Sequence, residues 1–333
     1  MKPTSSLLFT AAIVAVNAAA HAAPPTYRVT PVKDQAFSMG CQAINAQGDV
    51  AGTAVTEPRA NFGYDAVVVS RGHAHSYGWS HGQKAAEANG INAKRLTVGD
   101  VITDQVFRVA TPVAWHPDGR IEHLPGLGGS GGEARAVNDA GDIVGTVDAP
   151  SDSEHAVMWI DGRIVDLAPG TKWSGAAAVN ALRQAVGWSD GLPALFAGGQ
   201  VTTLGTLGGS SGSAHGINAS GLIVGAATLA GDALQHAFLY ADGTMTDLGS
   251  LPGRSSVAYG INASGVVVGL ATGSAGAPPT ALVWFDGLPY RLDDLLDPAS
   301  GQGWTFQIAN AVNDAGQICA DGSRGGAVLT PVR

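Results

Sequence analysis

The sequence predicts an all-β fold, a single seven-bladed β-propeller built from four-stranded blades. Three observations predict it. One motif recurs seven times along the chain, successive copies lie about 45 residues apart, and each copy carries turn residues where hairpins require them. A period of roughly 40 to 45 residues is typical of four-stranded propeller blades.

The repeated motif is a small residue, then Ile or Val, then Asn, with a Gly or once an Ala seven positions later. The Asn residues are Asn45, Asn92, Asn138, Asn180, Asn218, Asn262 and Asn313, and the later residues are Gly52, Gly99, Gly145, Gly187, Gly225, Gly269 and Ala320. The residue two positions before each Asn is Ala or Gly, so we expect it to line the narrow axis. The Ile or Val beside it then points into the packing between blades.

One copy shows the expected order of strands and turns. Strands are expected over 213–217, 222–224, 236–240 and 245–248. Asn218 and Gly221 occupy the first and fourth positions of a type I turn between the first two strands. Asp242-Gly243, between the last two, is a strong hairpin signal that recurs in other copies.

The two ends of the chain predict a closed ring. Residues 27–32 match a fourth strand, whereas 318–319 and 327–332 match only the second and third strands of the last copy. Pairing the ends would remove both sheet edges; two frayed ends of an open array are the alternative. Arg95 and Arg183 stand where other copies have the turn Gly, which leaves six or eight blades open.

The two cysteines also bear on closure. Cys41 lies in the first copy and Cys319 in the last, which are neighbours in a closed ring. We expect a closing disulfide, because disulfides persist in the oxidising compartments that exported proteins meet. Two buried free thiols are the alternative.

The N-terminus predicts export. Residues 1–22 have a short positive start, an apolar stretch over 7–16 and an Ala20-His21-Ala22 cleavage pattern, which together are typical of a secretory signal peptide. An ordinary apolar helix is the alternative. Cleavage after Ala22 leaves residues 23–333 as the propeller domain, secreted or periplasmic. No later stretch is long and apolar enough to span a membrane.

The charge narrows the range of partners. The net charge of −9 disfavours nucleic-acid binding. The expected partner is a glycan or a protein, and the expected state is a monomer.

Several segments resemble the HAF family of extracellular repeats. They are 204–209 (LGTLGG), 214–225 (AHGINASGLIVG), 235–243 (QHAFLYADG) and the closing segment 292–313. The resemblance covers essentially all of 23–333 and implies export and a β-propeller. It implies no catalytic residues. The His of the family motif is present only as His155 and His236, so a ring of His ligands is not expected.

Candidate ligand-binding residues lie on one face. Because strands alternate in direction, the stereotyped Asn and Asp-Gly turns share one face and the variable connections share the other. Function tends to lie on variable loops, and the connections from fourth to first strands approach the axis. The candidates there are Glu87, Glu133, Arg135, Lys172, Trp173, His215, Arg254 and Tyr259.

Three further clusters are weaker candidates, and no cofactor is expected. His73, His75 and His81, with Tyr77 and Trp79 among them, are a weak metal site. Asp293, Asp294 and Asp297 could offer oxygens to calcium but fit no EF-hand spacing. The glycine-rich segment 126–132 opens no predicted helix and precedes no Lys, so a flexible connection is favoured over a phosphate loop.

Three functions fit these features. A noncatalytic exported binding or interaction module is favoured, because no convergent acid–base pair is visible. A carbohydrate-active hydrolase or lyase using His215, Tyr259, Arg254 and Glu133 is the first alternative, by analogy of fold. A structural or surface-associated repeat protein is the second.

Overall fold

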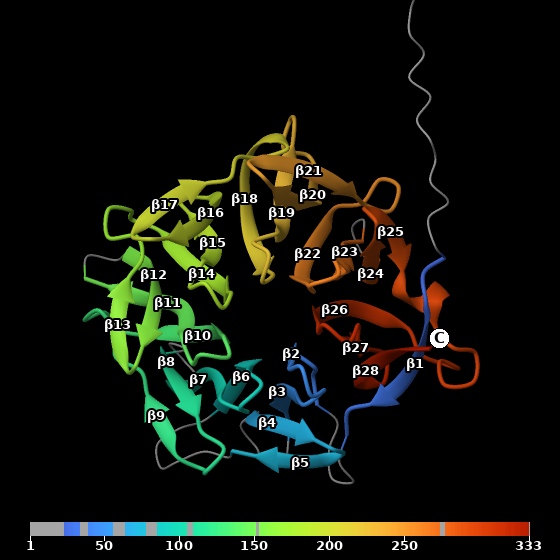
Figure 1. Cartoon of the computed structure of the whole chain (residues 1–333), viewed down its shortest axis with the longest axis horizontal. Helices are drawn as coiled ribbons and strands as arrows, with labels where there is room; N and C mark the ends of the chain where they lie inside the picture. The colour runs from blue at the N-terminus through green and yellow to red at the C-terminus, as the bar shows by residue number, and fades with distance from the viewer. Residues whose placement is uncertain are drawn as a thin grey trace, which may run out of the picture.

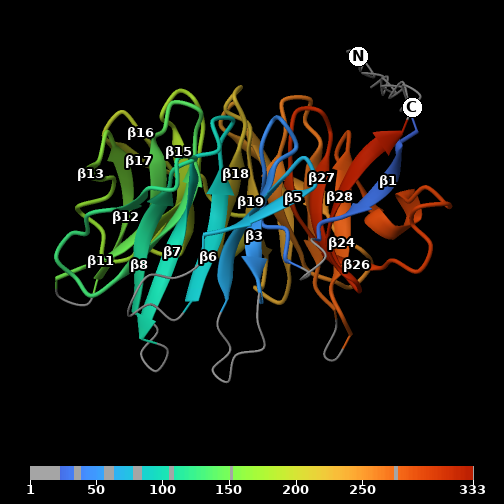
Figure 2. The same cartoon turned by 90° about the horizontal axis from the view of Figure 1, so that it is seen from below.

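The predicted all-β propeller is confirmed. A computed structural model describes residues 23–33, 39–55, 64–77, 85–104, 109–150, 153–273 and 277–332. In these residues, 28 strands form seven four-stranded antiparallel sheets. The sheets are arranged as blades around one axis (Figure 1), and the edge-on view in Figure 2 shows strands running between the two faces of the ring.

Each blade contributes one strand to each of four concentric layers. The first strands, which surround the axis, are β2 (Ala43–Ile44), β6 (Ala85–Ile91), β10 (Gly132–Val137), β14 (Ser174–Val179), β18 (Gly208–Ile217), β22 (Ser256–Ile261) and β26 (Phe306–Val312). The second strands are β3 (Val50–Ala54), β7 (Thr97–Asp104), β11 (Ile143–Ala149), β15 (Ala185–Ser189), β19 (Ile223–Leu229), β23 (Val267–Ala271) and β27 (Ile318–Gly322). The third strands are β4 (Asp65–Ser70), β8 (Val109–Trp115), β12 (Ser153–Ile160), β16 (Leu192–Ala197), β20 (Gln235–Ala241), β24 (Thr280–Phe285) and β28 (Gly325–Val332). The outermost strands are β5 (His73–Ser76), β9 (Ile121–His123), β13 (Arg163–Asp166), β17 (Gln200–Thr203), β21 (Thr244–Gly249), β25 (Leu288–Arg291) and, in the seventh blade, β1 (Thr26–Pro31).

The ring is closed by the N-terminal strand, as the sequence predicts. β1 lies beside β28 (Figure 1) and pairs with it antiparallel. The register places Tyr27 opposite Pro331. Tyr27 and Val29 are buried there and join the core of the seventh blade. The blade count is therefore seven, and the N-terminal strand completes the seventh blade to four strands.

The closing disulfide is also confirmed. Cys41 of the first blade is bonded to Cys319 in β27 of the seventh, with a Cα–Cα distance of 5.5 Å. The two residues are 278 positions apart in sequence, so the bond encloses nearly the whole ring. Beside it, the Asp321 carboxylate accepts a 2.8 Å hydrogen bond from the Cys41 amide.

A β-bulge explains the repeated Gly. In the third blade, Gly145 pairs with Ala134, and the register then shifts by one residue before Ala136. A Cβ at Gly145 would lie 2.0 Å from the carbonyl oxygen of Glu133, so no side chain fits. The same approach, at 1.9 to 2.1 Å, occurs at Gly52, Gly99, Gly187, Gly225 and Gly269. In the last copy, where Ala320 replaces Gly, β26 has a second register shift between Phe306 and Ile308.

The motif Asn residues form a closed ring of hydrogen bonds. Each Asn Nδ2 donates to the backbone carbonyl of the motif Asn in the next blade, at 2.9 to 3.3 Å. The last of these bonds runs from Asn313 to Asn45 and crosses the seam. Each Oδ1 accepts hydrogen bonds within its own turn; for Asn218 the donors are the amides of Ser220 and Leu222. One side chain therefore fixes a turn and joins two blades.

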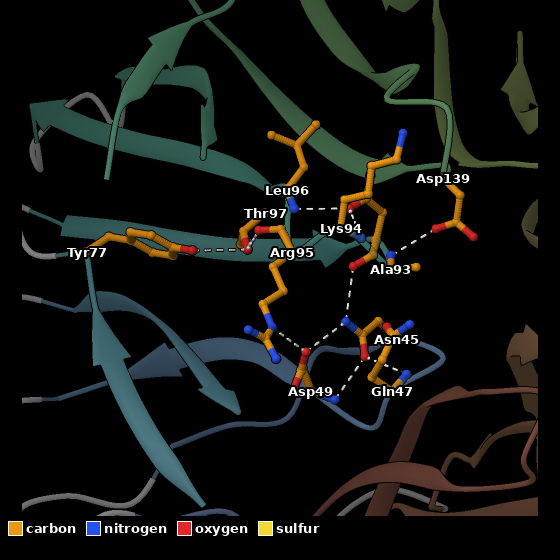
Figure 3. Close-up of polar contacts among 11 residues, drawn as sticks. Asn45, Gln47, Asp49, Tyr77, Ala93, Lys94, Arg95, Leu96, Thr97 and Asp139 are labelled. Carbon is orange, nitrogen blue, oxygen red and sulfur yellow. Dashed lines mark hydrogen bonds and ion pairs between the residues drawn. The ribbon is translucent and has the colours of Figure 1, made fainter. Parts of the chain in front are cut away.

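The two copies without the turn Gly are intact blades. Arg95 and Arg183 adopt the left-handed conformation with φ of 62° and 59°, which costs an L-residue about 1 kcal/mol. Their Nε atoms bond to Asp49 (2.7 Å) and Asp142 (3.0 Å) of the preceding blades; Figure 3 shows the first pair beside Asn45. Burial alone would raise the pKa of each buried carboxyl, but these hydrogen bonds hold it below the usual value.

The hydrophobic core lies mainly between blades. A Trp near the end of the third strand is fully buried in three blades: Trp115, Trp159 and Trp284. The Trp284 indole donates a 2.9 Å hydrogen bond to the Leu248 carbonyl of the preceding blade, and Trp159 does the same to Pro125 at 2.8 Å. Each of these two indoles adds a directional hydrogen bond to a large buried area.

Candidate functional site

A central cavity opens on the variable face of the ring. It has a volume of about 520 Å³ and is lined by the first strands of the blades. In every copy the lining includes the residue three positions before the motif Asn, which in six copies is the bulged residue. These residues are Gln42, Asn89, Arg135, Ala177, His215, Tyr259 and Asn310.

The position of these side chains refines the sequence-based expectation. We expected the small residue two before each Asn to line the axis, and Gly90, Ala136 and Ala311 do contact the cavity. Its small size is required mainly by the neighbouring blade, since a Cβ at Gly216 would lie 2.9 Å from the Tyr259 carbonyl oxygen. The bulge turns the residue directly before this small residue toward the axis. Its side chain faces the cavity and is therefore free to vary.

Two aromatic rings form one side of the cavity. The rings of His215 and Tyr259 lie 5.5 Å apart at an angle of 53°. His215 Nε2 contacts the Ser213 hydroxyl at 2.9 Å. Burial, reinforced by the charge of Arg135, lowers the pKa of the His215 imidazole to about 4. Burial also raises the pKa of the Tyr259 hydroxyl. Both rings are therefore uncharged at neutral pH.

The charges in the cavity balance. Arg135 Nη2 bonds to the Glu133 carboxylate, and both residues line the cavity. Arg135 remains 41% exposed, so its guanidinium can still reach a ligand. Among the lining residues these are the two ordinary charges, and they cancel. The cavity is formally neutral, and its lining combines polar side chains with Ala, Val and Ile.

Two Asn side chains, in the blades on either side of the first blade, stiffen the wall. Asn89 Nδ2 donates to Asp100 (3.3 Å) and to the Ala134 carbonyl of the next blade (3.1 Å). Asn310 makes the equivalent bonds to Asp321 (2.9 Å) and to the Cys41 carbonyl (2.7 Å). The disulfide seam and the cavity wall are thus directly connected.

The remaining predicted candidates do not line the cavity. Lys172 and Trp173 lie in the connection that precedes β14, with Lys172 Nζ 5.2 Å from the Trp173 ring centre. Arg254 donates a 3.0 Å hydrogen bond to Thr280 Oγ1. Glu87 lies in β6 and is absent from the cavity lining. The structure therefore brings together Glu133, Arg135, His215 and Tyr259 out of the eight.

Those weaker metal candidates of the first blade that the structure describes lie in or beside β5. His73 and His75 are exposed on β5, and His81 and Trp79 lie outside the described residues. Tyr77 instead stacks on Trp115, with ring centres 5.3 Å apart. Among the described residues there is no group of three or more His, Cys, Asp or Glu suited to a metal ion.

The acidic cluster of the last copy is bonded to its own chain. Asp293, in the short helix η1 (Leu292–Leu295), accepts from the Phe306 amide at 2.8 Å. Asp297 accepts from the amide and hydroxyl of Ser300 at 3.0 and 2.8 Å. Asp294 is exposed on η1. These bonds give Asp293 and Asp297 a structural role.

The His residues of the repeat motif have a structural role as well. His155 Nδ1 bonds to Asp166 at 2.7 Å, and His236 Nδ1 bonds to Asp247 at 3.0 Å. Both pairs join the third strand of a blade to its fourth. They lie away from the central cavity.

Comparison with solved structures agrees with the fold. The β-propeller domain of the trilobed protease from Pyrococcus furiosus, which has an open velcro topology, matches with a TM-score of 0.56 and 8% identity over 89% of this chain and 96% of that one. The WD40 β-propeller domain of Doa1 matches with a TM-score of 0.50 and 13% identity over 92% and 97%. At these identities the likeness is one of fold.

An extracellular propeller is among the similar structures. The extracellular domain of a protein described as a hybrid two-component system from B. thetaiotaomicron matches with a TM-score of 0.54 and 9% identity over 92% of this chain. The chain spans 40% of that protein's length. No family model and no curated protein matches the sequence. In the described part of the chain, no helix has the length and apolarity needed to cross a membrane.

The depressed pKa of His215 predicts a pH dependence of stability. An unfolded His protonates near pH 6.5, whereas folded His215 protonates near pH 4. The unfolded state therefore binds more protons between these values, and the free energy of unfolding falls as the pH drops. By pH 5 the loss should be about 2 kcal/mol.

Urea unfolding at pH 7.5 and pH 5 should show this loss of stability in the wild type and a much smaller loss in His215→Gln. His123→Gln, at an exposed position, is the control and should behave as the wild type.

Proposed function

We propose that this chain is an exported, noncatalytic binding propeller that takes an uncharged polar ligand in its central cavity. The observation that carries the proposal is the ring of seven equivalent positions around the axis, six of them at β-bulges. A uniform and rigid backbone there presents seven side chains, of which six are polar or aromatic. Ligand sites have this character, with few polar groups placed on a preformed concave surface.

The neutrality of the cavity supports an uncharged ligand. Arg135 and Glu133 balance each other, and His215 and Tyr259 are both uncharged at neutral pH. The Gln42 amide and the Tyr259 hydroxyl can both donate and accept hydrogen bonds. Asn89 and Asn310, whose Nδ2 groups already donate within the protein, can offer Oδ1 as an acceptor. Such a lining suits hydroxyl and amide groups of a ligand better than a net charge.

Export is supported by three features. The disulfide between Cys41 and Cys319 is a bond that persists in oxidising compartments. Residues 1–22, which lie outside the described residues, have the pattern of a signal peptide cleaved after Ala22. The resemblance of the repeats to the HAF family agrees with this, and we propose that the chain is a member that functions as a monomer.

The geometry favours binding over catalysis. Ser213 and His215 form a contact of the nucleophile–base type at 2.9 Å. A pKa of about 4 makes His215 a weak base at neutral pH, and Arg254 does not line the cavity. Both observations disfavour the hydrolase or lyase alternative, whose acid–base groups would be drawn from His215, Tyr259, Arg254 and Glu133.

A thermal-shift panel on residues 23–333 tests the proposal. The panel contains neutral and acidic oligosaccharides, peptidoglycan fragments and divalent metals. A ligand at about 100 times its Kd adds about 2.7 kcal/mol, a rise of a few degrees. We expect a neutral polar compound to raise the Tm of the wild type but not of Tyr259→Ala. Tyr64→Ala, outside the cavity lining, serves as the control. A shift confined to metals, or one unaffected by Tyr259→Ala, would contradict the proposal.

A further inference from the structure

The central cavity continues outward across the third blade. A depression of about 320 Å³ shares Glu133 and Arg135 with the cavity, and a second of about 620 Å³ shares Ser130, Asp148 and Glu154 with the first. We name these two depressions together the blade-3 groove. It leads from the axis towards Trp173 on the variable face, so the cavity and the groove form one continuous path.

The glycine-rich segment, 126–132 in the sequence, forms one wall of this groove. A Cβ at Gly129 would lie 2.4 Å from the Asp148 backbone, and a Cβ at Gly131 would lie 2.8 Å from the Ala110 carbonyl oxygen. The segment therefore lies directly on the backbones of β11 and β8, where no side chain fits. Its glycines leave the groove open, which explains a motif that the repeat pattern alone does not require.

Two tryptophans line the groove, one in each depression. Trp188 of β15 lines the inner one and packs on Gly175, where a Cβ would lie 2.8 Å from the indole nitrogen. Trp173 lines the outer one and is 41% exposed. Its backbone is held by Asp190, whose amide donates to the Trp173 carbonyl at 2.7 Å. Both indoles are thus presented from fixed backbone positions.

Polar groups stand between the two indoles. Asp148 accepts a 2.6 Å hydrogen bond from the Ser130 hydroxyl. Within the part of the chain that the structure describes, neither Asp148 nor Glu154 is in an ion pair. Thr146 Oγ1, in a residue 7% exposed, has no hydrogen-bond partner among the described residues and lines the inner depression. The groove is therefore rich in acceptors and carries excess negative charge.

We infer that the blade-3 groove binds an extended, uncharged oligosaccharide whose end enters the central cavity. Indole faces stack on the C–H faces of pyranose rings, and carboxylates accept hydrogen bonds from paired sugar hydroxyls. Two carboxylates outside ion pairs disfavour an anionic chain such as a uronate or sulfated polymer. The inference rests on the proposed function, since the central cavity is where the end of the oligosaccharide binds.

Calorimetric titration with disaccharides and hexasaccharides of the cello, xylo and chito series tests the inference. We expect one hexasaccharide to bind at least about tenfold more tightly than its disaccharide, because only the longer chain reaches Trp173. Trp173→Ala should weaken the hexasaccharide about tenfold and leave the disaccharide unchanged. Trp188→Phe should weaken both, since Trp188 adjoins the cavity. Hexagalacturonate should bind more weakly than that neutral hexasaccharide.

The controls separate this inference from the proposed function. Leu182→Ala removes an exposed apolar side chain from an Asn turn on the opposite face and should leave every affinity unchanged. Equal affinities for disaccharide and hexasaccharide, with no effect of Trp173→Ala, would overturn the groove and leave the cavity as the site. Binding of no oligosaccharide would also overturn the groove. The proposed function would then stand only if the panel gave another neutral ligand sensitive to Tyr259→Ala.

Discussion

Removal of the Cys41–Cys319 disulfide is expected to lower the free energy of unfolding by about 2–5 kcal/mol. The bond closes a loop of 278 residues, and long loops restrict the unfolded chain most. A loss of this size corresponds to a fall in Tm of roughly 4–10 °C in a domain this large. Differential scanning calorimetry with and without reductant measures it.

The double variant Cys41→Ala/Cys319→Ala provides the control. It should unfold at the temperature of the reduced wild type and should not respond to reductant. Strand β1 still pairs with β28 in this variant, so the ring should stay folded at room temperature. Equal Tm values for oxidised and reduced wild type would show that the disulfide contributes nothing to closure.

Replacement of one motif Asn is the second large effect that we expect. Asn218 is 5% exposed, and its side chain accepts from two turn amides and donates to the Asn262 carbonyl. Asn218→Ala loses all three bonds and leaves buried groups unpaired, which should cost about 2–4 kcal/mol. Chemical unfolding at neutral pH measures the loss.

Two further variants separate the loss of stability due to the turn hydrogen bonds from the loss due to the hydrogen bond between blades. Asn218→Asp keeps the acceptor for the turn amides but places a carboxylate against the Asn262 carbonyl, so it should remain clearly destabilised. Ser220→Ala, in the same turn, removes an exposed hydroxyl and should leave stability within about 0.5 kcal/mol of the wild type. If Asn218→Asp were as stable as the wild type, the bond between blades would have no energetic role.

Sequence reasoning predicted the parts of the fold that depend on repetition. The seven blades, the completion of the seventh blade by the N-terminal strand and the disulfide all follow from features repeated or matched along the chain. Seven Asn residues at a regular period, complementary ends and two cysteines in adjacent copies are enough to specify them. The hydrogen-bond ring itself was not predicted, because the Asn was assigned only to its turn.

The candidate site was predicted only in part, for a physical reason. The cavity side chains stand one position from the small residue of the motif, where seven copies have Gln, Asn, Arg, Ala, His, Tyr and Asn. Because the residue type at this position varies from copy to copy, a search for repeated residues does not detect it. The Gly seven positions after the motif Asn, present in six of the seven copies, is the sequence signal that could have revealed the bulge.

The blade-3 groove was beyond sequence reasoning for a different reason. Its lining comes from three blades, with Ala110, Asp148 and Trp188 far apart in the chain. The glycine-rich segment appeared to be a connection, and Trp173 appeared as a residue near the axis. Only the folded ring shows that both belong to one radial path.

The central claim is that the axis cavity binds a ligand, and one variant tests it most directly. Ala177 occupies the bulge position of the fourth blade and projects little into the cavity. Ala177→Trp should fill that space while removing no polar group, and Ala177→Ser is its matched control. Calorimetric titration with the compound that gives the largest shift in the panel should show at least a tenfold loss of affinity in Ala177→Trp and none in Ala177→Ser. Unchanged affinity in a folded Ala177→Trp protein would place the binding site elsewhere and contradict the account.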